Sequence, residues 1–427
     1  MTCRDVIRME REVTTARALF QREFFSVLIV VVNAFSWYFP LYLLFKSTLE
    51  KFQESLQLNP IFLFTVFGVQ FAAIVCSAII GTALVKRLPN RERLLSAWMF
   101  IGIIASILMV TLETFSITNI FIVSSVLGIS LGLGFPSCLA YFGDHSTVEN
   151  RGWLGGVTFF ASGLCILFIG LVLNFSGLIA GAIILAVWRG VGLLLFILSG
   201  LKQDFHVEKK VETSYKSILV ERSFYLNLIP WMMFCLVNFL EAPVVDAHLG
   251  EDFTWIIPIA EYGIGGFVAL AGGWFADSVG RKRIVMVGFI MLGIGYASLG
   301  FLPENVLSWY LYTVVDGIAW GIFSLMFYLV IWSELAGNLN KEKYYLIGVS
   351  PFLIASYIQI LFTPLVGEVT NISAAFSLAS FFLFIAVLPI LYAPETMPQK
   401  HIELKRLRKF ADEAKKAKEK YERKIKA

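Results

Sequence analysis

Four ionisable residues lie inside long apolar stretches of this 427-residue chain. A charge in such surroundings is costly and usually has a partner or a function. Asp316, Glu241 and Glu261 are acids that could hold a proton or bind a polar solute. Arg189 could bind a carboxylate or a phosphate, or pair with an acid of the chain itself. These residues are the first candidates for a binding or proton-transfer site.

The surroundings of the three acids leave alternatives open. Asp316 lies near the middle of its apolar run, close to Trp320, and either contacts a solute or proton or is hydrogen-bonded inside its own helix bundle. Glu241 precedes Pro243, which disturbs a helix, so it suits a gate or a proton site or else faces water. Glu261 lies in the next run, where it could neighbour Glu241. We expect any coupling chemistry among these acids of the second half.

The first half of the chain offers an amide and an aromatic ring in its first apolar run. These are Asn33 and Trp37. Aromatic rings stack on sugar or ring faces, but tryptophan also marks membrane interfaces. Both residues are therefore candidates for solute contact, with an interfacial position as the alternative.

The elements that must position these residues are twelve apolar runs. They cover 24–45, 60–83, 94–112, 118–141, 152–174, 177–200, 224–244, 253–276, 284–301, 306–333, 344–366 and 371–393. A helix of about 20 apolar residues crosses the roughly 30 Å of hydrocarbon in a bilayer, and runs of this length can cross it only as helices. The chain is 58% hydrophobic and 15% charged, with a mean hydropathy of +0.75. It is predicted to be an all-α integral membrane protein.

The runs divide six and six around segment 201–223, the longest charged stretch between them. We expect an amino-terminal segment 1–23, a six-helix lobe 24–200, a linker 201–223, a second six-helix lobe 224–393 and a basic tail 394–427. Two bundles joined by a polar linker are the layout of a two-lobed transporter. The tail is either a basic helix lying along the membrane or a solvated segment.

Nearly all of the 35 Lys and Arg residues lie in the two terminal segments and in every second loop. This distribution predicts that both termini are cytoplasmic and that the partner of the basic surface is membrane lipid, with no nucleic acid. The cysteine and histidine spacings indicate no metal site, and no nucleotide-binding loop or hydrolase motif is present. We therefore expect no cofactor and no enzymatic activity.

The sharpest local motif comprises Gly273, Asp277, Gly280, Arg281 and Lys282, between the eighth and ninth runs. Asp277 lies at the unfavourable end of its helix dipole, so it needs a partner such as an arginine or the amino-terminal end of another helix. The motif resembles the signature loop of the major facilitator superfamily, Gly-x-x-x-Asp-x-x-Gly-Arg-Arg/Lys. Together with the six-plus-six layout, the resemblance covers nearly the whole chain.

The resemblance implies the major facilitator fold, with twelve transmembrane helices in two six-helix lobes and a gate on the cytoplasmic side. Asp277 would face the start of the fifth span, near Arg151 and Gly152. Asp144 and Glu334, at cytoplasmic helix ends, would belong to the same gate. Spans 1, 4, 7 and 10 line the central cavity in this superfamily, which would place Asp316 at the cavity. Span 6 is peripheral, so structural pairing is expected for Arg189.

The corresponding loop of the first half departs from the pattern. Gly81 is present, but Val85 stands where the acid would be and Leu88 where the second glycine would be. The gate is therefore expected to be one-sided. The string Pro394-Glu395-Thr396 resembles a motif of sugar-transporting members, and three residues favour a sugar only slightly.

These observations favour a secondary transporter that moves a small organic solute by alternating access, with a proton as a candidate coupling ion. A monomer in the cell membrane is expected. The alternative is a transporter-like sensor or assembly partner that binds a ligand without turnover, which the basic tail leaves open.

Overall fold

The computed structural model describes residues 3–88, 90–199, 211–249, 256–363 and 371–397, and the side chains of these ranges except 3–23 and 246–261. This described part is helical, with short connections and one isolated bridge between Val211 and Leu339. Eleven of its helical segments are long and apolar enough to cross a membrane. A further helix, α11, lies in the chain between the seventh and eighth of these segments. The prediction of an all-α membrane protein is confirmed.

The helices follow the predicted apolar runs closely. The first half contains α1 (Cys3–Leu56), α2 (Pro60–Val85), α3 (Arg91–Leu108), η1 (Met109–Glu113), α4 (Ile117–Gly132), α5 (Phe135–Asp144), α6 (Arg151–Asn174) and α7 (Leu178–Leu198). The linker contributes α8 (Tyr215–Val220). The second half contains α9 (Arg222–Leu249), α11 (Ile256–Val279), α12 (Arg281–Phe301), α13 (Val306–Ser324), η2 (Leu325–Val330), α14 (Ile331–Ala336), α15 (Lys341–Phe362) and α16 (Ile372–Tyr392).

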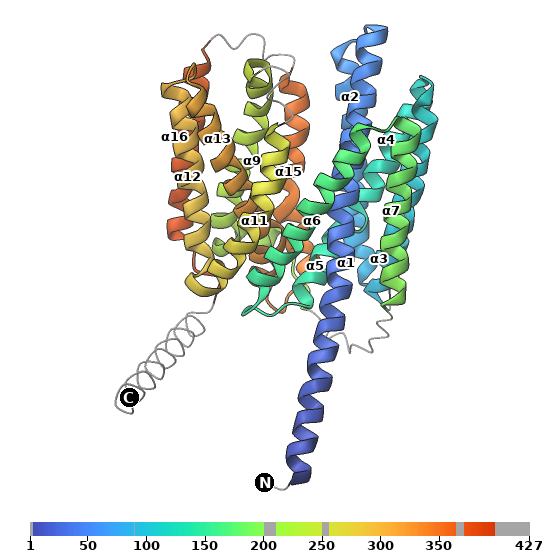
Figure 1. Ribbon diagram of the computed structural model, residues 1–427, viewed down its shortest axis with the longest axis vertical. Helices are drawn as coiled ribbons and strands as arrows, with labels where there is room; N and C mark the ends of the chain where they lie inside the picture. Colours follow the sequence, from blue (N-terminus) through green and yellow to red (C-terminus); the bar gives the residue numbers. More distant parts are fainter. Residues whose placement is uncertain (1–2, 89, 200–210, 250–255, 364–370, 398–427) are drawn as a thin grey trace, which may run out of the picture.

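The helices form two groups that converge at one end (Figure 1). We call this the gate end; it carries the loops around residues 86–91, 144–151, 277–282 and 334–341. The start of α1 and the end of α16 lie at the same end (Figure 1). Across the two groups, α6 packs against α11, and α2 and α5 pack against α15. Contacts between the lobes therefore come from a small set of helices.

The loop predicted at 46–59 is mostly helix, because α1 continues to Leu56. No glycine or proline interrupts residues 46–56, and Lys46 pairs with Glu50 one turn later at 3.7 Å. The chain turns only at 57–59, where the side chain of Asn59 accepts a hydrogen bond from the amide of Ile61 and caps α2. The first helix therefore continues beyond its apolar run.

Two crossings are interrupted near their middle, at related places in the two halves. The fourth crossing breaks between α4 and α5, where Pro136 has no amide hydrogen to continue the helical ladder. The tenth crossing contains η2, a turn of π-helix that includes Tyr328. Such insertions in helices are frequent at functional sites. The break in the second lobe turns out to adjoin the central cavity.

Candidate functional site

A cavity of about 320 Å³ lies between the two lobes. Helices α1, α2 and α6 line it from the first lobe, and α9, α11, α13, η2 and α15 line it from the second. Its volume is at the lower end of the roughly 300–1,000 Å³ that is typical of small-molecule sites. The cavity is therefore large enough for a small organic solute.

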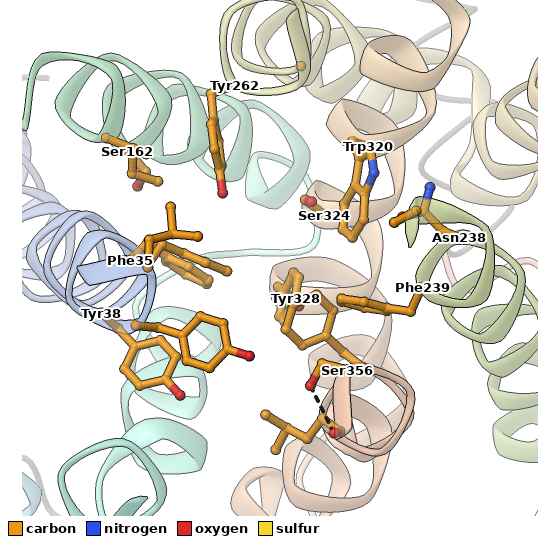
Figure 2. A pocket seen from close by; sticks show the side chains of 18 of the residues that line it. Phe35, Tyr38, Ser162, Asn238, Phe239, Tyr262, Trp320, Ser324, Tyr328 and Ser356 are labelled. Carbon is orange, nitrogen blue, oxygen red and sulfur yellow. Dashed lines mark hydrogen bonds between the residues drawn. The ribbon is translucent and has the colours of Figure 1, made fainter. Parts of the chain in front are cut away.

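Aromatic side chains dominate the cavity wall. They are Phe35, Tyr38, Phe39, Tyr42, Phe67, Phe71, Phe159, Phe239, Tyr262, Trp320, Tyr328, Phe352 and Tyr357. Figure 2 shows Phe35 and Tyr38 approaching from one side, with Phe239, Trp320 and Tyr328 on the other. Trp320, a residue singled out in the sequence, is thus a wall residue of the cavity.

Asp316 lies behind this wall and not on it. Its side chain is fully buried in α13, and its Oδ1 accepts a hydrogen bond from Nδ2 of Asn238 at 3.1 Å. Asn238 in α9 does line the cavity. The amide therefore separates the acid from the cavity and is in contact with both.

Glu241 belongs to the same buried region of the second lobe. It is 7% exposed, and it interacts electrostatically with Asp316 and with the hydroxyl of Tyr296 in α12. Two acids and a tyrosine thus form one polar cluster between α9, α12 and α13. The side chain of Glu261 lies outside the described residues, so its relation to this cluster stays a prediction.

Arg189 is fully buried inside the first lobe, and its immediate neighbours are aromatic. The guanidinium carbon lies 4.4 Å from the ring centres of both Trp37 and Trp98. One nitrogen donates to Oδ1 of Asn33 at 2.7 Å. Among the described residues no carboxylate lies within salt-bridge distance of this guanidinium. Two indole faces and one amide take the place of the expected acid.

Asn33 and Trp37 consequently face the interior of their own lobe. Nδ2 of Asn33 donates to the carbonyl of Trp188, and Nε1 of Trp37 donates to Ser106 at 2.8 Å. Neither residue is among the described side chains that line the cavity. The cavity face of α1 carries a different set of residues with helical spacing: Phe35, Tyr38, Phe39, Tyr42 and Lys46. Both faces repeat every three to four residues, so the sequence alone could not select the correct one.

At the gate end, Asp277 binds the amino terminus of α6. Its carboxylate accepts hydrogen bonds from the amides of Gly152 at 3.0 Å and Trp153 at 2.7 Å. Arg281, one turn along the chain, pairs with the same carboxylate at 2.7 Å. The positive end of the α6 dipole and the arginine both favour the negative charge. Asp277 therefore joins the two lobes, and Gly273 lies against the backbone of Gly152 beside it.

Glu334 is held by cations from both lobes. Arg281 of the second lobe donates to its Oε1 at 3.0 Å, and Arg151 of the first lobe approaches the same oxygen at 3.7 Å. Arg281 also donates to the carbonyl of Val148 across the interface at 2.7 Å. Because Glu334 and Arg281 are each about 1% exposed, these interactions are shielded from solvent.

Asp144 occupies the corresponding place in the first lobe. Arg91 of its own lobe pairs with it at 2.6 Å, and Lys341 of the other lobe pairs with it at 2.7 Å. Arg91 also pairs with Glu342 in the first turn of α15. The ion pairs of the gate are thus repeated in the two halves, with Arg91 in the role of Arg281.

The missing acid at Val85 is compensated in part by other contacts between the halves. Arg91 reaches Glu342, as described, and Lys86 pairs with Glu212 of the linker at 2.7 Å. Lys343 donates to the carbonyl of Thr213, also in the linker. The gate therefore has cross-lobe contacts on both sides, and in the described part of the chain the carboxylate of Asp277 binds the amino terminus of α6 in the opposite lobe.

The motif Pro394-Glu395-Thr396 is part of this network. The carboxylate of Glu395 accepts from the amides of Arg281 at 2.9 Å and Lys282 at 3.2 Å, capping α12, and Thr396 donates to Glu334 at 2.5 Å. The ammonium group of Lys282 donates to the carbonyls of Leu391 and Ala393 at the end of α16. Gly280 makes the tight turn with a φ of 108°. Because Arg281 and Glu395 are 114 residues apart in the chain, the sequence carried no signal for this role of Glu395.

Substitution of Gly273 by alanine tests the contact between the lobes. A Cβ at this position would collide with the carbonyl of Gly152, whereas a Cβ at Gly263 of the same helix has its nearest neighbour at 3.9 Å. A collision that costs about 1–2 kcal/mol would change the ratio of closed to open gate roughly 5- to 30-fold. Gly273→Ala should therefore lengthen the distance between spin labels at 147 and 283, measured by pulsed electron paramagnetic resonance in a cysteine-free background. Gly263→Ala is the matched control, and equal distances in the two variants would contradict this role of the contact.

Substitution of Arg189 by lysine tests the aromatic clamp, by which we mean the contact of this guanidinium with the rings of Trp37 and Trp98. Lysine keeps the charge but loses the planar stacking on Trp37 and Trp98. We therefore expect the free energy of unfolding to fall by about 2 kcal/mol and the midpoint of thermal unfolding to be lower. Arg222→Lys, at an exposed position, is the control. Indistinguishable midpoints for the two variants would show that the clamp contributes no stability.

The comparisons with known proteins bear on the fold. No family model matches this sequence, and no curated protein sequence matches it. Solved structures do match. The proton:xylose symporter XylE bound to 6-bromo-6-deoxy-D-glucose is similar at a TM-score of 0.65 and 15% identity, over 87% of this chain and 96% of that one.

Two further structures match over 87% of this chain and 98% of theirs. A bacterial homologue of the iron transporter ferroportin in its outward-facing state has a TM-score of 0.67 at 13% identity. The transporter FucP in the outward conformation has a TM-score of 0.66 at 11% identity. The protein is therefore a multi-pass membrane protein with the fold of the major facilitator superfamily.

Proposed function

We propose that this protein is a secondary transporter that moves a small organic solute across the cell membrane by alternating access. The observation that carries the proposal is a solute-sized cavity between two lobes whose contacts at the gate end are polar and individually separable. The charge distribution supports a cytoplasmic position for the gate end. Rocking of the lobes would break the gate contacts and open the cavity to the cytoplasmic side.

The gate chemistry supports such a cycle. A closed gate needs contacts strong enough to exclude leakage and weak enough to break repeatedly, and hydrogen-bonded ion pairs whose acids keep a cation of their own lobe meet both needs. When the lobes separate, Asp277 retains Arg281, Glu334 retains Arg281, and Asp144 retains Arg91, because these partners lie in the same lobe. Each acid therefore keeps a cation in both states, which lowers the cost of opening.

Proton coupling through the second lobe is part of the proposal. Asn238 contacts the cavity and donates to Asp316, so a solute that binds Asn238 would change the hydrogen bonding of the acid behind it. Glu241 and Tyr296 belong to the same buried polar cluster as that acid and interact with it electrostatically. Substrate occupancy and protonation would thus be linked by one amide.

The experiment is solute-driven proton movement in proteoliposomes. Pools of sugars, organic acids, amino acids, lipophilic amines and neutral aromatic compounds are tested on the wild-type protein and on Asp316→Asn. We expect at least one pool to move protons with the wild type, and a more than tenfold smaller signal with Asp316→Asn, while solute exchange at equal concentrations persists. Exchange depends on the cavity and gate alone, whereas net proton movement needs a titratable group at 316.

The control for this experiment is Glu304→Gln, which removes an acid from an exposed loop of the second lobe away from the gate end. An unchanged pH profile for Asp316→Asn would remove this residue from the coupling mechanism. Binding of a solute with no exchange and no net uptake by correctly inserted protein would favour a ligand sensor instead.

A further inference from the structure

We infer that the solute is an uncharged, ring-bearing, amphipathic molecule with hydrogen-bond acceptor oxygens, such as a multi-ring ketone or ester. This inference rests on the proposed function, because it names the substrate class of the same cavity. It goes beyond the fold, since the similar structures include a xylose symporter bound to a sugar derivative and a homologue of an iron transporter.

The aromatic walls provide the first argument. Phe35 lies 5.6 Å from Tyr328 across the interface between the lobes, and Phe39 lies 6.3 Å from both Tyr262 and Phe352. These are ring-centre distances of interacting aromatic pairs. The two lobes therefore meet along the cavity through ring faces and edges, and a flat apolar solute between them would find the same stacking partners.

The second argument is a set of buried donors that have no partner among the described residues. They are Nε2 of Gln70, Nε1 of Trp320 and the hydroxyl of Tyr328, and all three residues line the cavity. Gln70 and Tyr328 are each 3% exposed. Gln70 belongs to the first lobe, and Trp320 and Tyr328 belong to the second. A buried donor without an acceptor costs free energy, so a solute that supplies acceptor oxygens to these donors would gain affinity.

Part of the polar wall is already used within the protein. Ser162 donates to the carbonyl of Thr158, and Ser356 donates to the carbonyl of Leu353. Asn238 donates to Asp316. The hydroxyls of Tyr38, Tyr42, Tyr357 and Ser324 also belong to lining residues. Because most of the lining surface is nevertheless apolar, a ring-bearing ketone with few polar groups fits this wall better than a monosaccharide.

The third argument is charge. Among the described residues that line the cavity, only Lys46 carries a charge. Its ammonium group is partly exposed and pairs with Glu50. An anionic or cationic solute would give up hydration without a buried counter-ion in contact with it. Asp316 does not offset this cost for a cation, because the amide of Asn238 lies between the acid and the cavity. The wall therefore favours a neutral solute over its charged analogues.

A matched series of two-ring probes tests the inference with the full-length protein in lipid nanodiscs. The probes are 2-acetonaphthone, 2-naphthoate, 2-naphthylmethylamine, naphthalene and D-glucose, with equilibrium binding measured for each. We expect the neutral ketone to bind at least tenfold more tightly than the carboxylate, the amine or glucose. Tighter binding of any of these three would overturn the inference.

Two variants separate cavity binding from partition into lipid. Trp320→Phe keeps a ring and removes the N–H group. It should therefore weaken binding of the ketone roughly fivefold and leave binding of naphthalene unchanged. Phe352→Ala should weaken the binding of both the ketone and naphthalene. Phe381→Ala, on the exposed surface of α16, should weaken the binding of neither. Equal ketone binding by the wild type, Trp320→Phe and Phe352→Ala would place the probe outside this cavity and overturn the inference.

The outcomes distinguish this inference from the proposed function. Ketone binding with the expected variant pattern, combined with no exchange or uptake, would uphold the substrate class and overturn transport. Robust transport of a sugar, an organic acid or an amine would uphold transport and overturn the substrate class.

Discussion

The cost of an unpaired charge in a low-dielectric environment governs the arrangement of this molecule. Most of its ion pairs lie at the gate end, where loops and helix termini offer partners from both lobes. The few ionisable groups inside the helices are enclosed in one lobe each: Arg189 in the first, Asp316 and Glu241 in the second. The interface between the lobes is left to aromatic rings and amides along the cavity. Lobes that meet through such groups can separate without exposing a charge to lipid.

The gate shows similar ion pairs in the two halves although the motif loop itself is incomplete in the first half. Each half supplies one acid that binds a cation of its own lobe and approaches a cation of the other: Glu334 with Arg281 and Arg151, Asp144 with Arg91 and Lys341. Only Asp277 has no acidic counterpart in the first half, where Val85 stands at the corresponding position. When the lobes part, Asp277 keeps Arg281 but gives up two backbone amides at the amino terminus of α6. The asymmetry therefore makes the α6–α11 side of the gate the one with the larger electrostatic change on opening.

Length and hydropathy were sufficient to predict the helices, because lipid permits no other structure for apolar runs of this size. The dipole argument predicted that Asp277 needs a partner, and the family resemblance pointed to the start of the fifth span, where its carboxylate accepts hydrogen bonds from Gly152 and Trp153. Which face of a helix meets the cavity was not predictable: on α1, Asn33 and Trp37 repeat with the same period as Phe35 and Phe39. The partners of Arg189 were equally hidden, because two indoles from different helices replace the acid that electrostatics would suggest. Arg91, Glu342 and Glu395 act through contacts between distant segments, which composition and spacing do not encode.

The position of Asp316 behind Asn238 has a consequence for energy coupling. An acid exposed in the cavity would bind cations directly and would exchange protons with water whether or not solute were present. An acid covered by an amide is protected from both, and its hydrogen bonding changes when the amide turns to a new partner. In this lobe the amide donates to Asp316, and Glu241 lies in the same buried cluster. Under the proposed function, a neutral solute that binds Asn238 would influence the protonation of Asp316 without contacting a charge, so an uncharged cavity is compatible with the proposed coupling to a proton.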